Sequence, residues 1–162
     1  MLAGHPDLFC PPELHLLQFD NMKERQQSLG NSYLTEGLDR ALLDIGDRDA
    51  HPVQTIAQNW VEQEAPVTQV YKWMQDAVSP RILIDKSPTY GSEYETLLCA
   101  ETYFENPKYI HLVRHPYSVI ESFVRNRMEK LGGIETRNPS RFAEQVWCET
   151  NANILDLSLI HI

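Results

Sequence analysis

Cysteine is scarce in this sequence, which has only Cys10, Cys99 and Cys148 among its 162 residues. The three are widely separated and lack the close spacing of zinc ligands, so we expect no structural metal and favour reduced cysteines in a cytoplasmic protein. Long hydrophobic runs are also missing, and no apolar stretch approaches the length that spans a bilayer. The sequence therefore predicts neither a metal site nor a membrane partner.

Cations are also few, because 14 Lys and Arg residues stand against 23 Asp and Glu, which gives a net charge of -9. General nucleic-acid-binding proteins carry a basic face, so we expect no nucleic-acid partner. A hydrophobic content of 42% and a charged content of 23% are typical of a soluble globular domain. If this chain binds an anion, a few local cations must do so.

The most informative stretch covers residues 81–131 and reads as strand, helix, strand, helix. A short apolar run at 81–85 is followed by Ser92 and Glu95, which have the spacing of a capping box at a helix start. A second apolar run follows at 109–113. A helix of this length between two apolar runs predicts a parallel βαβ unit.

A cation follows each predicted strand, Lys86 after the first and Arg114 after the second. The carboxyl ends of parallel strands form the ligand-binding edge of an open α/β sheet, so these two cations indicate an anionic ligand. Pro116 fits the first position of a helix whose N-terminus faces that edge. Ser118 and Ser122 are four residues apart on this helix, and both hydroxyls could reach a phosphate held by Arg114.

The beginning of the chain predicts another short strand at residues 7–10, after which Pro11 and Pro12 impose an extended turn. Glu13 and His15 then follow close to the strand end. An alternative interpretation is that Glu13 only caps a helix that runs through the following leucines.

Helical spacing dominates residues 33–79, where we predict three helices, the second beginning at Pro52 and the third after Pro66. This helical insert separates the first strand from the βαβ core. Residues 18–31 are polar and end in a Gly-Asn break. A last helix is predicted from Pro139.

Two motifs in this chain resemble those of sulfotransferases that use 3′-phosphoadenosine 5′-phosphosulfate (PAPS). Arg114, with Ser122 eight residues later at a strand-to-helix junction, resembles their 3′-phosphate-binding motif. The Asp-Lys-Ser-Pro segment at residues 85–88 resembles the lysine-proline turn that precedes it. The opening residues 1–17 resemble the segment through which protein-tyrosine sulfotransferases reach their catalytic glutamate. Over residues 1–156 the likeness is to sulfotransferase domains of olefin-forming modular polyketide synthases.

The resemblance implies a three-layer α/β fold of the P-loop-kinase-like sulfotransferase type, with a central parallel sheet. It implies PAPS as the cosubstrate, no metal, and transfer of a sulfuryl group to a hydroxyl. Glu13 matches the position of the catalytic base, with His15 as the alternative, because the attacking hydroxyl must lose a proton. Lys86 would stabilise charge on the departing nucleotide, and Arg114 with Ser122 and Ser118 would hold its 3′-phosphate.

The acceptor implied by this likeness is the 3-hydroxyl of an acyl chain on an acyl carrier protein. Protein-tyrosine, carbohydrate and small-metabolite acceptors remain open, as does a phosphoryl-transfer relative or a non-catalytic binding module of the same fold. Lys86 could instead pair with Asp85 or extend into solvent. Arg114 could be structural, and Ser122 could bond back into its own helix.

Both ends of the chain suggest an incomplete domain. In the family, a phosphate-binding loop for the 5′-phosphosulfate precedes the segment that Met1 begins here. Residues 157–162 match the translation of a common sequencing-transposon end, so we treat them as an adapter scar. We therefore expect a partial domain at residues 1–156 that is inactive by itself.

Overall fold

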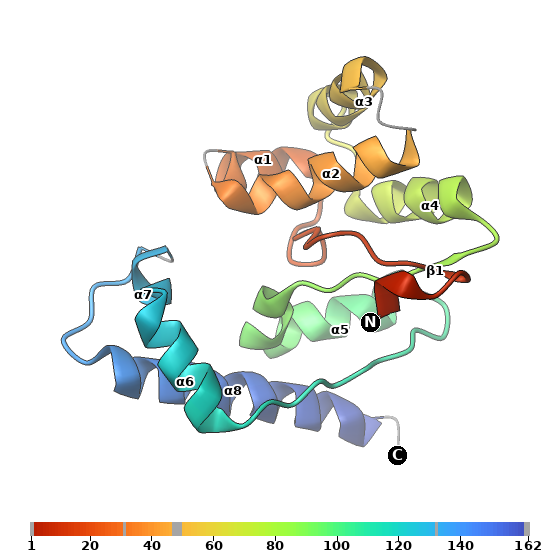
Figure 1. The fold of residues 1–162 in the computed structure, drawn as a ribbon. Coiled ribbons are helices and arrows are strands. Elements are labelled where there is room, and N and C mark those ends of the chain that lie inside the picture. Colours follow the sequence, from red (N-terminus) through yellow and green to blue (C-terminus); the bar gives the residue numbers. More distant parts are fainter. Residues whose placement is uncertain (1, 31, 47–49, 132, 161–162) are drawn as a thin grey trace. The chain divides into compact units, whose positions relative to one another are not determined.

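The computed structural model describes the whole chain except residues 1, 31, 47–49, 132 and 161–162. The chain forms two compact units, Met1–Tyr90 and Gly91–Ile162 (Figure 1). Within the described ranges, each helix is either too short or too polar to cross a bilayer.

A pair of parallel strands lies in the first unit, formed by β1 (Leu8–Phe9) and β2 (Ile82–Leu83). Leu8 is opposite Ile82 in the register. Strands were predicted at both places, and both are found, although each is shorter than its apolar run. Because the strands are parallel, the segments that follow them leave the same edge of the sheet.

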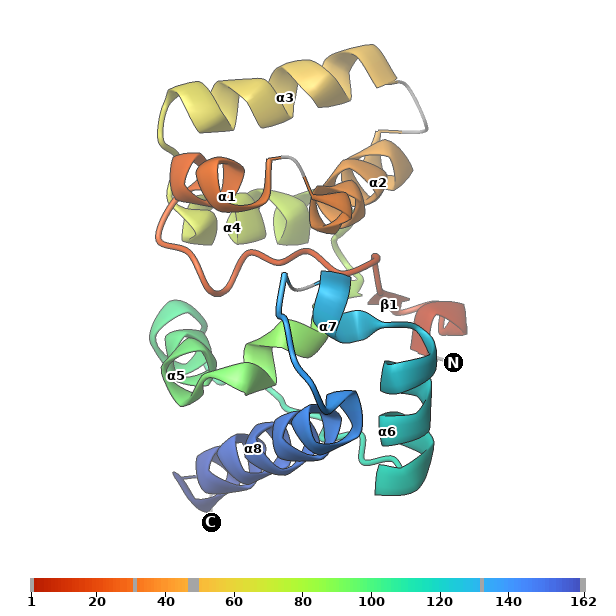
Figure 2. The same ribbon diagram turned by 90° about the vertical axis from the view of Figure 1, so that its left-hand side faces the viewer.

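Among the described residues, four helices lie between the two strands in the sequence. They are α1 (Met22–Leu29), α2 (Glu36–Ile45), α3 (Ala50–Glu62) and α4 (Val67–Val78), with a 3₁₀ turn at Tyr33–Thr35. Another 3₁₀ turn, at Leu2–Gly4, precedes β1. In Figure 2, α3 lies across α1 and α2. Side chains from α1, α2 and α4 fill the core with Met22, Leu38, Leu42, Val67, Val70 and Met74. The three predicted helices are therefore confirmed.

Helix α1 was not predicted, because its sequence is polar. Its apolar positions are only Met22 and Leu29, and its N-terminus is capped by Asn21, whose side chain accepts a hydrogen bond from the Glu24 amide at 2.9 Å. Arg25 lies on the same face as Met22 and is buried. A buried arginine inside a polar stretch hides the amphipathic pattern from sequence analysis.

The regular secondary structure among the described residues of the second unit is helical. Its helices are α5 (Tyr94–Tyr103), α6 (Pro116–Arg125), α7 (Met128–Leu131) and α8 (Pro139–Ile160), and a 3₁₀ turn at Pro88–Ser92 joins the two units. Helix α6 packs along α8, with an edge contact of 5.9 Å between the ring centres of Phe123 and Phe142. Pro139 begins α8, as predicted.

The prediction of a strand at residues 109–113 is wrong for this structure. The segment is extended, but β1 and β2 pair only with each other among the described residues. Its apolar side chains are open to solvent, with Ile110 70% and Leu112 87% exposed. A strand exists only when a neighbour takes up its backbone hydrogen bonds, and the apolar pattern of this run says nothing about that neighbour.

Two predicted details of helices also differ. Helix α5 begins after Glu93, and Ser92 instead ends the preceding 3₁₀ turn, so the predicted capping box is not formed. The helix predicted at residues 117–131 is broken into α6 and α7. The break lies at Arg127, whose φ of 51° is left-handed and cannot continue a right-handed helix.

Candidate active site

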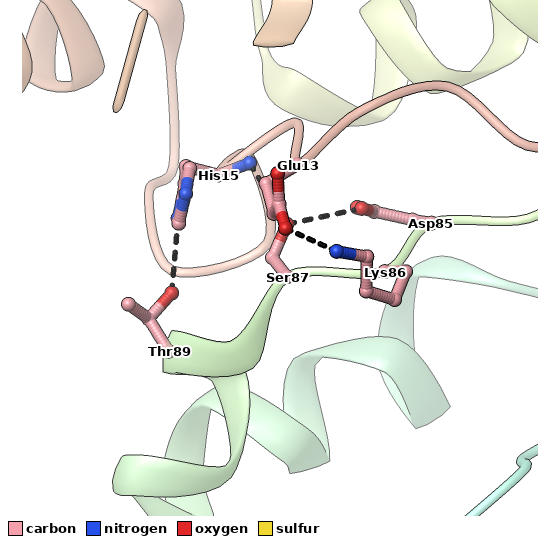
Figure 3. A network of polar contacts seen from close by, with 6 residues as sticks. All are labelled: Glu13, His15, Asp85, Lys86, Ser87 and Thr89. Atoms are coloured by element: carbon pink, nitrogen blue, oxygen red, sulfur yellow. Dashed lines mark hydrogen bonds and ion pairs between the residues drawn. The ribbon is translucent and has the colours of Figure 1, made fainter. Parts of the chain in front are cut away.

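Polar side chains meet where the chain leaves β1 and β2. Residues 13–17 follow the first strand and residues 85–90 follow the second, so parallel pairing brings together segments that lie about 70 residues apart in the sequence. Figure 3 shows Glu13 and His15 on the first segment facing Asp85, Lys86, Ser87 and Thr89 on the second. The sequence-predicted residues Glu13, His15 and Lys86 are therefore neighbours.

Glu13 and Lys86 form an ion pair, in which the Lys86 ammonium contacts Glu13 Oε1. Both side chains face solvent, with Glu13 39% and Lys86 66% exposed. The hydrogen bond from Lys86 lowers the pKa of Glu13, so Glu13 is an ionised carboxylate at neutral pH. The sequence analysis left open that Lys86 pairs with Asp85 or extends into solvent. In the structure Lys86 pairs with Glu13 and not with Asp85.

His15 is buried, with 2% of its surface exposed, and its amide donates to Ser87 Oγ at 3.1 Å. Its ring Nδ1 lies 3.0 Å from Thr89 Oγ1, and the Thr89 hydroxyl donates to Gln18 Oε1 at 3.1 Å. A hydroxyl has only one proton to donate, so Nδ1 of His15 must be the donor to Thr89. The other ring nitrogen, Nε2, is then unprotonated.

The pKa of His15 is lowered, first because burial disfavours the imidazolium and then because the Arg25 guanidinium is close. Among the other nearby charges, Asp85 and Glu13 oppose this shift and Lys86 adds to it. His15 is therefore neutral at neutral pH, and it can accept a proton at Nε2.

Asp85 holds the two segments together and is not a free anion. Its Oδ2 accepts hydrogen bonds from the hydroxyls of Tyr71 at 2.5 Å and Tyr90 at 2.7 Å, and its Oδ1 accepts one from Ser87 at 3.2 Å. The Tyr90 oxygen in turn accepts from the Leu16 amide at 2.9 Å. Burial raises the pKa of Asp85 despite these hydrogen bonds. This network was not predicted, because the sequence gives no signal that two tyrosines converge on one carboxylate.

Arg114, Ser118 and Ser122 lie in the second unit. Pro116 occupies the first turn of α6, as predicted, and Arg114 lies just before this helix, where its carbonyl accepts a hydrogen bond from Trp147 Nε1 at 3.2 Å. Within the described part of the chain, the exposed Arg114 guanidinium has no hydrogen-bond or ion-pair partner. Ser122 Oγ accepts from Asn126 at 3.2 Å.

The described residues include no group of three His, Cys, Asp or Glu side chains that could hold a metal ion. The model of the sulfotransferase family matches residues 1–156. The chain belongs to the sulfotransferase family. A comparison with curated proteins found no match.

Two solved sulfotransferase domains are similar to this family member. One is the sulfotransferase domain from the curacin biosynthetic pathway, at 53% identity and a TM-score of 0.90, covering 96% of this chain and 55% of that one. The other is the sulfotransferase domain from the Synechococcus PCC 7002 olefin synthase, at 48% identity and a TM-score of 0.88, covering 96% of this chain and 54% of that one. The predicted family and fold are confirmed, and this sulfotransferase chain spans about half the length of these relatives.

Proposed function

We propose that this sulfotransferase chain carries the acceptor-activating and 3′-phosphate-binding residues for sulfuryl transfer from PAPS to a hydroxyl. The observation that carries the proposal is the pairing of Glu13 with Lys86 at the carboxyl edge of the parallel strands, in a chain of this family. In this reaction the acceptor oxygen bonds to sulfur while the bond from sulfur to the nucleotide phosphate breaks. The acceptor proton passes to a base, and the nucleotide leaves as adenosine 3′,5′-bisphosphate.

Glu13 is our choice for the base. A base must reach the hydroxyl it deprotonates, and Glu13 is 39% exposed whereas His15 is 2% exposed. His15 is the alternative, because it is neutral with an unprotonated Nε2. Lys86 bonds Glu13 and, with its other ammonium protons, would stabilise charge on the departing nucleotide.

The acceptor we propose is the 3-hydroxyl of an acyl chain on an acyl carrier protein, in a cytoplasmic biosynthetic system. The similarity to sulfotransferase domains of the curacin pathway and of an olefin synthase supports this class of acceptor. Protein tyrosine, carbohydrate and small-metabolite hydroxyls are the competing acceptors.

This chain spans about half the length of the two solved domains, so we test activity in a domain of their length. We therefore define the completed domain as residues 1–156 joined to the parts of the curacin-pathway domain that this chain does not match. Incubated with PAPS labelled in the sulfuryl group, it should transfer label to a 3-hydroxyacyl carrier protein. It should not label the carrier protein bearing a 3-deoxy acyl chain. If the completed domain labelled a tyrosine peptide or a sugar faster than the carrier protein, that compound would be the acceptor and the carrier-bound acyl chain would not.

Arg114→Ala in the completed domain should weaken binding of adenosine 3′,5′-bisphosphate by about 1.5 to 3 kcal/mol, the range for a lost charged hydrogen bond. Binding of adenosine 5′-phosphate, which lacks the 3′-phosphate, should not change. Isothermal titration with both nucleotides measures the difference.

The matched control is Arg125→Ala, because Arg125 is an exposed arginine of the same helix region that lies 3.9 Å from Glu121 on the helix surface. It should bind both nucleotides normally. If Arg114→Ala weakened the binding of both nucleotides equally, Arg114 would not be a ligand of the 3′-phosphate.

A further inference from the structure

The segment that carries Glu13 and His15 has no regular secondary structure, so other groups must hold its backbone. Side chains far away in the sequence do this on one side, where Ser87 accepts from the His15 amide at 3.1 Å and Tyr90 accepts from the Leu16 amide at 2.9 Å. His15 itself has a φ of 48°, which is left-handed and unfavourable for a residue with a side chain. Such a conformation persists only where the surroundings fix it.

Arg25 of helix α1 fixes the carbonyl side of the same segment. Its Nε donates to His15 O at 3.1 Å, and its Nη2 donates to Leu14 O at 3.0 Å. Arg25 is only 3% exposed, and it takes part in no ion pair among the described residues. The charges of Asp39 and Asp85 favour the charged form of Arg25, but its side-chain hydrogen bonds go to two successive carbonyls of this segment, which indicates that the buried guanidinium holds them.

Gly37 of helix α2 meets the segment at Glu13. A Cβ atom at position 37 would lie 1.8 Å from the Glu13 carbonyl oxygen and 2.7 Å from its carbon. Both are backbone atoms that cannot rotate away, so no side chain fits there. Glycine weakens a helix relative to alanine, and this close approach accounts for its presence in the first turn of α2.

We infer that Arg25 and Gly37 are positioning residues, which hold the backbone of residues 13–15 so that Glu13 reaches Lys86 and His15 reaches Thr89. Neither residue touches the reacting groups in this inference, and each acts through the segment. Arg25 holds it by hydrogen bonds, and Gly37 lets α2 lie directly against it. The inference rests on the proposed function for its catalytic meaning, but its geometry can be tested separately.

The catalytic test uses Gly37→Ala and Arg25→Gln in the completed domain. A displacement of about 1 Å at catalytic groups costs on the order of 100-fold in rate, so we expect kcat to fall by about that factor. The KM for PAPS should stay within about twofold, because Arg114 and Ser122 are not in this segment. The controls are Gly4→Ala, where a Cβ meets nothing within 4 Å, and Arg40→Gln, which changes an exposed arginine of α2. Both controls should keep the parent kcat.

The geometric test follows the ¹⁵N signals of His15 by NMR in the unmodified chain and in each variant. The parent should show a neutral ring protonated at Nδ1. Arg25→Gln removes a cation that lowers the pKa of His15, so the imidazole should titrate at higher pH, with Asp85, Glu13 and Lys86 still in place. Gly37→Ala should alter the tautomer by displacing the ring from Thr89.

Arg25→Lys serves if Arg25→Gln does not fold, because it keeps the buried charge but cannot bind two carbonyls with a planar fork. Loss of kcat with altered His15 signals supports the inference. Folded variants with parent kcat and parent His15 signals overturn it. If the completed domain itself transfers no sulfuryl group, the proposed function fails, and the His15 signals alone still decide whether Arg25 and Gly37 hold the segment.

Discussion

Glu13→Gln in the completed domain should lower kcat for sulfuryl transfer by about 10²- to 10⁴-fold, the usual contribution of a general base. Glutamine keeps the size of the side chain and can still accept a hydrogen bond from Lys86, but it cannot take up the acceptor proton. The affinity for adenosine 3′,5′-bisphosphate should not change, because the 3′-phosphate residues lie elsewhere in the chain. Steady-state kinetics and nucleotide titration measure the two effects.

The pH dependence of kcat distinguishes Glu13 from His15. A base works only when deprotonated, so the rate should fall as the pH drops through its pKa. For Glu13 the ion pair with Lys86 lowers the pKa, which places this fall at pH values below those of an ordinary glutamate. For His15 burial lowers the pKa, which places this fall at pH values below those of an ordinary histidine.

The matched variant for this comparison is His15→Asn. If Glu13 is the base, kcat of Glu13→Gln should no longer decrease at low pH. The kcat of His15→Asn should still decrease at low pH, even if this substitution disturbs the segment. A fully active Glu13→Gln enzyme would transfer the role of base to His15.

Much of the site could be predicted because its residues follow the strands directly. Lys86 comes after one apolar run, Glu13 after another, and parallel strands place such residues at one edge whatever the intervening sequence. The periodic apolar residues of α2 and α4 and the proline of α6 also identify these helices from local patterns alone.

The features that could not be predicted depend on contacts between distant parts of the chain. Arg25 is buried because two carbonyls of another segment surround it, so its polar helix has no recognisable apolar face. Gly37 has no sequence signal of its own, because its importance depends on the position of the Glu13 carbonyl. At residues 109–113 the sequence predicted a strand that the structure does not form. The apolar run is typical of a strand, but it has no strand neighbour in the described structure.

Asp85→Ala should destabilise the first unit by about 1.5 to 3 kcal/mol, the range for a lost hydrogen bond to a charged group. Removal of the carboxylate takes away the acceptor that the buried hydroxyls of Tyr71 and Tyr90 share, although these two hydroxyls can still bond each other. It also loosens the link through Tyr90 to the amide of Leu16. Urea unfolding of the unmodified chain and the variant, followed by circular dichroism, gives the difference in free energy.

Asp85→Asn separates the role of the hydrogen bonds from that of the charge. The amide oxygen can still accept from the tyrosines, so this variant should lose much less stability than Asp85→Ala.

The folded-state pKa of Asp85 is raised, so the folded chain holds its proton more tightly than the unfolded chain does. The contribution of Asp85 to stability should therefore fall as the pH rises from the ordinary aspartate range through the raised pKa. Asp85→Asn should lack this decline, and equal pH profiles for the two chains would mean that Asp85 is not desolvated in the folded state.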